Sequence, residues 1–217
     1  MDPLSIPSAI LVLIFRTLLL QPFTVASGAM LPTAEVGDYL IASKYSYGYS
    51  QFSLPMGAYL PAFEVLKAPP KRGDVVFFAL PSDPSTTYIK RVIGLAGDRV
   101  QMIDGTTYLN GKPLPRKRVD DFNSDNGPDK YADVPRYVET MPDGRSYDVI
   151  ELSDSAEGDN TAVFTVPPGH CFVMGDNRDN SADSRFTVGY LPYANIFAKA
   201  FVIVDYSGNS LKTHAIK

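Results

Sequence analysis

Cysteine and histidine, the residues of redox chemistry and of many metal sites, are rare in this chain. Among its 217 residues there is one cysteine, Cys171, and there are two histidines, His170 and His214. A single cysteine excludes an intrachain disulfide, and two histidines are too few for a metal site with several histidine ligands. On a strand, His170 and Cys171 would point to opposite faces, which makes a Cys-His pair a poor fit. We predict no metal and no cofactor.

Charge and apolar content narrow the class of protein. The chain has a net charge of −4 and 45% hydrophobic residues, with a sequence pI of about 5.1. This acidic balance lacks the electrostatic footprint of a protein that binds nucleic acid. Its length allows one large β domain, or one domain with a smaller one inserted.

An apolar segment at residues 9–20 reads AILVLIFRTLLL and is interrupted by Arg16. A full membrane span needs about 20 apolar residues, so the segment falls short. It fits the tail of a membrane anchor, the core of a signal peptide, or a buried helix of a soluble protein. Asp2 and the absence of a basic residue before Arg16 weaken the signal-peptide interpretation. We expect residues 1–20 to be a residual membrane anchor, or an apolar segment added during cloning.

The rest of the chain has the pattern of short strands joined by tight turns. The sequence contains 18 Pro and 16 Gly, which are frequent at turns. Asp104-Gly105 and residues 142–144 predict hairpins, and Asn110-Gly111 predicts a further turn. Residues 167–169 predict another hairpin, and residues 115–135 read as an exposed loop. Strands are predicted at 39–43, 74–80, 88–95, 99–103, 106–109, 137–140, 146–152, 161–166, 171–174 and 200–206.

The fold class that follows is mainly β. We expect a main antiparallel β domain formed by residues 21–98 and 170–217, which becomes the catalytic domain under the family resemblance given below. Residues 99–169 are expected to form an inserted, hairpin-rich subdomain.

Lys90 lies in YIKRVIGLAGD, between apolar neighbours on one face of a predicted strand. Burial disfavours the ammonium form and lowers the pKa of a lysine. A neutral amine can accept a proton from a hydroxyl group. Taken alone, Lys90 fits a solvated surface lysine better than a base.

A second dense segment, GDNRDNSADSR, occupies residues 175–185. Its Asp, Asn and Ser side chains favour tight turns, and its arginines can pair with the carboxylates. The spacing lacks the glycine and the terminal glutamate of an EF-hand, so Ca²⁺ binding is not predicted. Alone, the segment fits a polar surface loop equally well.

Four segments in this order resemble the conserved boxes of bacterial signal peptidase I, a Ser/Lys endopeptidase family. They are PFTVASGAMLPT, KRGDVVFF, YIKRVIGLAGD and GDNRDNSADSR, and the likeness runs from about residue 16 to residue 217. The family cleaves signal peptides after a small residue, with another small residue two positions earlier. The resemblance implies signal peptides of exported preproteins and the membrane lipid surface as partners. It also implies a bacterial inner membrane location with the catalytic domain on the extracytoplasmic side.

The resemblance also implies roles for single residues. Lys90 matches the general base, Ser181 the serine that orients it, and Ser27 a hydroxyl of the oxyanion hole. Asp183 and Arg185 match a supporting pair. Residues that match the walls of the substrate pockets are Phe23, Val25, Met30, Tyr88, Ile89 and Ala182.

Position 29 departs from the family pattern. The family usually reads Pro-Ser-Gly-Ser-Met where this chain reads ASGAM, so Ala29 occupies the position of the nucleophilic serine. A methyl group cannot form an acyl-enzyme. Ala26 replaces a proline, which is a milder change. The backbone N–H of residue 29 is retained, so oxyanion binding can persist.

Three interpretations follow. The chain is a signal peptidase I whose serine was deliberately changed to alanine, or a natural non-catalytic homologue that binds signal peptides or a partner. The third is a self-cleaving Ser/Lys regulator of the SOS-repressor type. The apolar N-terminal segment and the acidic charge speak against the third.

Overall fold

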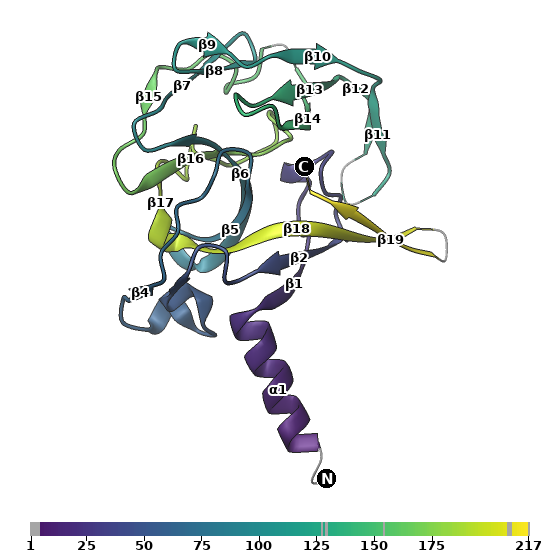
Figure 1. The fold of residues 1–217 in the computed structure, drawn as a ribbon. Coiled ribbons are helices and arrows are strands. Elements are labelled where there is room, and N and C mark those ends of the chain that lie inside the picture. The colour runs from purple at the N-terminus through teal and green to yellow at the C-terminus, as the bar shows by residue number, and fades with distance from the viewer. Residues whose placement is uncertain (1–4, 127, 129, 154, 208–209, 217) are drawn as a thin grey trace.

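The computed structural model describes residues 5–126, 128, 130–153, 155–207 and 210–216 (Figure 1). It is built mainly of antiparallel strands, as predicted. The chain begins with helix α1 (Ser5–Leu18), which projects away from the sheets in Figure 1.

Helix α1 exposes apolar side chains on all sides. Ile10, Leu13 and Phe15 are about half exposed, and Leu11 is 68% exposed. The alternative of a buried helix is therefore wrong. Within the described residues, none of the helices has the length and apolarity needed to cross a bilayer. Residues 1–4 of the expected anchor segment lie outside the described part.

The largest sheet has the strand order β1-β2-β18-β5-β6-β16-β17, with β19 paired to β18. Every pair in it is antiparallel. Its strands are β1 (Leu20–Thr24), β2 (Tyr39–Ser43), β5 (Val75–Leu80), β6 (Asp83–Leu95), β16 (His170–Met174), β17 (Leu191–Pro192), β18 (Ile196–Ser207) and β19 (Ser210–Ala215).

Smaller sheets and four single-turn 3-10 helices complete the fold. One sheet has the order β15-β7-β8-β9, another β10-β13-β14, and two are the pairs β11-β12 and β3-β4. Their strands are β3 (Tyr49–Ser50), β4 (Glu64–Val65), β7 (Arg99–Ile103), β8 (Thr106–Leu109), β9 (Lys112–Pro113), β10 (Arg116–Arg118), β11 (Phe122–Ser124), β12 (Tyr131–Val134), β13 (Arg136–Thr140), β14 (Ser146–Ile150) and β15 (Phe164–Thr165). The 3-10 helices are η1 (Gly28–Met30), η2 (Gln51–Ser53), η3 (Gly57–Tyr59) and η4 (Tyr193–Asn195).

The predicted turns are confirmed where two neighbouring strands pair directly. Strands β7 and β8 meet around Asp104-Gly105, and both turn residues have positive φ, as a type I′ hairpin requires. Strands β8 and β9 meet around Asn110-Gly111, again with positive φ at both residues. Strands β13 and β14 form the hairpin predicted at residues 142–144.

Two sequence predictions are wrong. Residues 161–166 and 171–174 do not pair with each other, because β15 pairs with β7 while β16 pairs with β6. Residues 115–135 are not simply an exposed loop, since they form β10, β11 and β12. Phe122 and Tyr131 of this segment are buried, because they pack in a small cluster with Leu31 and Ile150.

The apolar core is divided among several clusters. One joins β1, β2, β5 and β18 with Met30 of η1, and a second lies around Val76, Phe78 and Val173. A third joins Ile93 and Phe172 of the large sheet to β7, β8 and β14. The smaller sheets therefore share a core with β6 and β16, the strands that lead into the site described next.

Candidate active site

The single turn η1 presents position 29. Ala29 and Met30 are buried, while Ser27 just before the turn is exposed. The Asn177 backbone N–H donates to the Ala29 carbonyl oxygen at 3.2 Å. The Asn177 side-chain amide donates to the Gly28 carbonyl oxygen at 3.0 Å. The segment 175–177 thus fixes the backbone at position 29.

Gly175 brings position 29 and Ser181 together. A Cβ atom on Gly175 would overlap the Ser181 hydroxyl oxygen and lie 2.5 Å from the Ala29 carbonyl oxygen. Only glycine fits between these two groups. The Ser181 Oγ is buried and has no hydrogen-bond partner among the described residues.

Lys90 is buried on β6, a strand that contacts η1. The residue is only 4% exposed, and its Nζ lies 5.4 Å from the centre of the Tyr88 ring. Burial lowers the pKa of Lys90 to about 8; Asp183 and Asp176 oppose this shift, and Arg185 adds to it. Lys90 is thus buried, unlike the solvated surface lysine that its sequence fits when taken alone, and its amine can exchange a proton near neutral pH.

Asp183 and Arg185 form a buried pair, as expected for a supporting pair. The Arg185 guanidinium donates to the two carboxylate oxygens at 3.0 and 2.9 Å. The same carboxylate accepts the Gly175 N–H at 3.1 Å, and Arg185 also donates to the Arg178 carbonyl oxygen. These hydrogen bonds tie residues 175, 178, 183 and 185 of the segment together.

Two more buried ion pairs surround the site, and the sequence did not reveal their partners. Arg91 donates to both oxygens of Asp176 at 2.8 and 2.7 Å. Arg178 donates to Glu139 at 2.6 Å, although Glu139 comes from β13. A charged residue inside an apolar strand hints at such a pair, but the partner is set by the tertiary fold.

Tyr131 is a further residue that the sequence did not single out. Its hydroxyl accepts hydrogen bonds from the side-chain amides of Asn177, at 3.4 Å, and Asn180, at 3.1 Å. A Cβ atom on Gly28 would lie 3.1 Å from the same hydroxyl. The segment 115–135 therefore touches both the turn at position 29 and the 175–185 segment.

The residues matched to substrate pockets do not all lie together. Val25 and Met30 belong to one apolar cluster, and Phe23 and Ile89 pack against it. Tyr88 packs against a different cluster, and Ala182 is exposed. Four of the six residues are thus gathered beside η1.

The groups that this site offers for chemistry are polar side chains and a backbone turn. Among the described residues, no three His, Cys, Asp or Glu side chains come together as metal ligands. The site contains a lysine with a lowered pKa, a buried free hydroxyl and a fixed backbone turn. The lysine and the hydroxyl are suited to moving a proton.

Comparisons with known proteins agree on one family. The sequence profile described as "Signal peptidase, peptidase S26" matches residues 3–205. The signal peptidase I of Rickettsia canadensis is 44% identical over 197 residues, which is 87% of this chain and 72% of that protein. The signal peptidase I of Rickettsia prowazekii is 42% identical over 196 residues, covering 87% of this chain and 73% of that protein.

One solved structure is also similar to this chain. The crystal structure of a signal peptidase I from Enterococcus faecalis is 27% identical in sequence. The match covers 59% of this chain and 94% of that one, with a TM-score of 0.35. The sequence matches carry the assignment: this chain belongs to the signal peptidase family, peptidase S26.

Proposed function

We propose that this chain binds the signal peptides of exported preproteins in the manner of signal peptidase I, and does not cleave them. The observation that carries the proposal is the position of Ala29. Its backbone is hydrogen-bonded to Asn177 and adjoins the free hydroxyl of Ser181 across Gly175. The groups for proton transfer are retained, and a nucleophilic oxygen at position 29 is not.

The reaction of a serine at position 29 defines what is lost. Its hydroxyl transfers a proton to the neutral amine of Lys90 as its oxygen attacks the scissile carbonyl carbon. The resulting oxyanion is held by the backbone N–H of residue 29 and the hydroxyl of Ser27. When the C–N bond breaks, the Lys90 ammonium returns the proton to the leaving amine, and water then hydrolyses the acyl-enzyme. Ala29 has no proton to give and no oxygen to attack.

The apolar cluster beside η1 is the proposed binding site for the small residues of the cleavage site. Phe23, Val25, Met30 and Ile89 supply its walls. Tyr88 and Ala182 complete the set that the resemblance implies, although neither belongs to this cluster. Such walls favour a methyl group and exclude a bulky side chain.

The proposed location is the outer face of a bacterial inner membrane. The exposed apolar side chains of α1 support an attachment to lipid. We also propose that residues 21–98 and 170–217 form the catalytic unit, with residues 99–169 inserted. The strand order supports this division, because the large sheet is drawn only from the two outer segments.

A binding assay tests the proposal. A fluorescent signal peptide with alanine at the two recognition positions is titrated into the chain as it stands. We expect saturable binding without cleavage. A peptide with phenylalanine at both positions should bind at least tenfold more weakly, because the methyl-sized pockets exclude it. Equal binding of the two peptides would reject the pocket assignment.

The second candidate is a natural non-catalytic homologue, and Ala26, a further departure from the family pattern, is the observation in its favour. The native gene decides between the two. A serine codon at position 29 there eliminates the natural homologue. The repressor-type regulator finds no support in the family match.

A further inference from the structure

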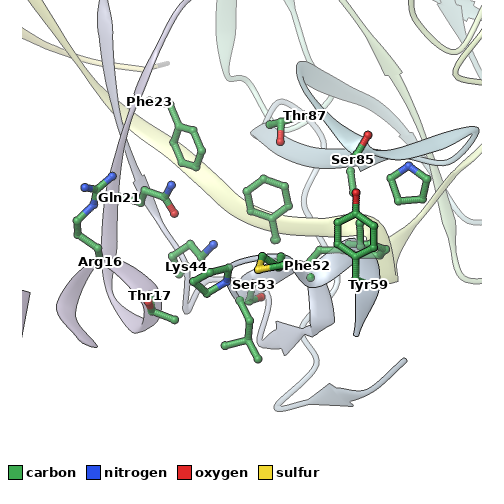
Figure 2. A pocket seen from close by; sticks show the side chains of 18 of the residues that line it. Arg16, Thr17, Gln21, Phe23, Lys44, Phe52, Ser53, Tyr59, Ser85 and Thr87 are labelled. Carbon is green, nitrogen blue, oxygen red and sulfur yellow. The ribbon is translucent and has the colours of Figure 1, made fainter. Parts of the chain in front are cut away.

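A pocket of about 510 Å³ lies between the end of α1 and the β5–β6 turn (Figure 2). It is enclosed by the last turns of α1, by the segment that contains η2 and η3, and by residues near the β5–β6 turn. Ala29, Lys90 and Ser181 do not line it. Phe23 is shared with the proposed substrate cluster, so the two sites adjoin at this side chain.

Lys44 gives the pocket a buried positive charge. The residue is 4% exposed, and its Nζ lies 4.6 Å from the centre of the Phe197 ring. Burial lowers the pKa of Lys44 to about 8. The buried arginines Arg91, Arg178 and Arg185 each pair with a carboxylate. Within the described part of the chain, Lys44 has no such partner.

The lining has a uniform sign of charge. Arg16 is its second cation, and the lining includes neither Asp nor Glu. Figure 2 shows Arg16, Gln21 and Lys44 on one side of the pocket and Ser85 and Tyr59 on the other. An anion is the ligand that this arrangement favours, because a desolvated cation gains most from a charge-assisted hydrogen bond.

The neighbouring helix indicates what is attached to that anion. The exposed apolar side chains of α1 extend to the pocket, where Leu13 lines it beside Arg16. A basic residue at the end of an apolar helix is typical of the boundary between acyl chains and headgroups. Phe52 and Phe197 continue the apolar surface inside the pocket.

We propose that this pocket binds the phosphate of an anionic phospholipid, with Lys44 and Arg16 at the phosphate and the acyl chains along α1. The lipid would hold the part of the large sheet next to α1 against the membrane surface. It would also cover the apolar side chains that α1 exposes. The inference concerns binding only, so it stands or fails independently of cleavage and of residue 29.

The test uses short-chain phosphatidylglycerol below its micelle concentration, titrated calorimetrically into the full chain. We expect saturable binding that Lys44→Met weakens about tenfold, as for the loss of one charge-assisted hydrogen bond. Lys67→Met is the matched control, because Lys67 is an exposed lysine outside the pocket. It should leave the affinity unchanged. An equal loss of affinity in both variants would show that the lipid is held only by unspecific electrostatic attraction, and would overturn the proposal.

Additional arms separate the possible ligands. Arg16→Gln changes an exposed residue, so it tests the pocket without risk to the fold, and it should also weaken lipid binding. Glycerol phosphate and short-chain phosphatidylcholine should bind more weakly than phosphatidylglycerol. Glycerol phosphate binding as tightly as the lipid would show a site for a free anion instead. Displacement of the lipid by a signal peptide would assign the pocket to the peptide and overturn the proposal.

Discussion

Gly175 lies against Ser181 so closely that a Cβ atom on the glycine would overlap the serine hydroxyl. The same Cβ would collide with the Ala29 carbonyl oxygen. Two parts of the chain that are far apart in sequence thus meet at a residue without a side chain. The contact defines the spacing of the candidate site.

Gly175→Ala should therefore disturb the site more than the rest of the fold. We expect the free energy of unfolding to fall by about 1–3 kcal/mol, the usual effect of overpacking. In an Ala29→Ser background, the peptidase activity of each folded molecule should also fall. Gly97→Ala is the control for a general loss of stability: its positive φ strains an alanine, but a Cβ there meets no atom within 4 Å. The account requires that Gly97→Ala keeps its activity per folded molecule. An equal loss of activity in Gly97→Ala would show that the close contact at Gly175 is not the cause.

The buried pair of Arg178 and Glu139 should matter to stability through the penalty of an unpaired charge. Arg178→Met alone is expected to cost about 3–5 kcal/mol, since it leaves the Glu139 carboxylate buried without its partner. The double variant Arg178→Met, Glu139→Leu should recover most of that loss. Urea unfolding of the single and double variants measures the difference. A double variant no more stable than Arg178→Met would contradict the account.

Lys90 should make stability depend on pH. Its pKa is lowered to about 8 in the fold, against about 10.4 in an unfolded chain. Between these values the unfolded chain binds more protons, so the free energy of unfolding rises with pH from about 8 to about 10. Below pH 8 the lysine is protonated in both states and its burial cost is complete. Lys90→Met should be more stable than the parent at pH 7, with a gap that narrows above pH 8.

The same titration should govern catalysis once a serine is present. In Ala29→Ser, kcat/KM is expected to rise with pH and level off above about 8, because the neutral amine of Lys90 is the base. The pH profile of peptide cleavage checks this. Lys44 has a lowered pKa of similar value, so Lys44→Met serves as the control. If the pH profile shifts in Lys44→Met but not in variants around Lys90, the observed pKa belongs to Lys44. That result would contradict the prediction.

The sequence predicted the fold well where the signal is local. Asp104-Gly105 and residues 142–144 marked their hairpins correctly, because the turn residues themselves impose the geometry. The hairpin predicted at residues 167–169 was wrong, because β15 finds its partner in β7 instead. Pairing at a distance is set by the packing of the sheets, which a turn motif does not encode.

The contacts of the candidate site were likewise not predictable where they join distant parts of the chain. Lys90 is buried in the structure, although its local sequence alone fits a solvated surface lysine better. The pairing of Arg178 with Glu139, and the contact of Tyr131 with Asn177, join residues from separate strands. Nothing in the local sequence relates them. The meeting of position 29 with Ser181 was expected only from the family resemblance.

The most direct test of the account is the cleavage of a signal-peptide substrate by the chain and by Ala29→Ser. The control is the double variant Ala29→Ser, Lys90→Met, which keeps the nucleophile and removes the base. The account predicts no cleavage by the chain as it stands. It predicts a gain on the order of 10⁶ in Ala29→Ser, since that is the scale of the loss when a nucleophile is removed. The double variant should lose this gain. A folded Ala29→Ser variant that binds the peptide and stays inert, or a parent chain that cleaves as fast, would contradict the account.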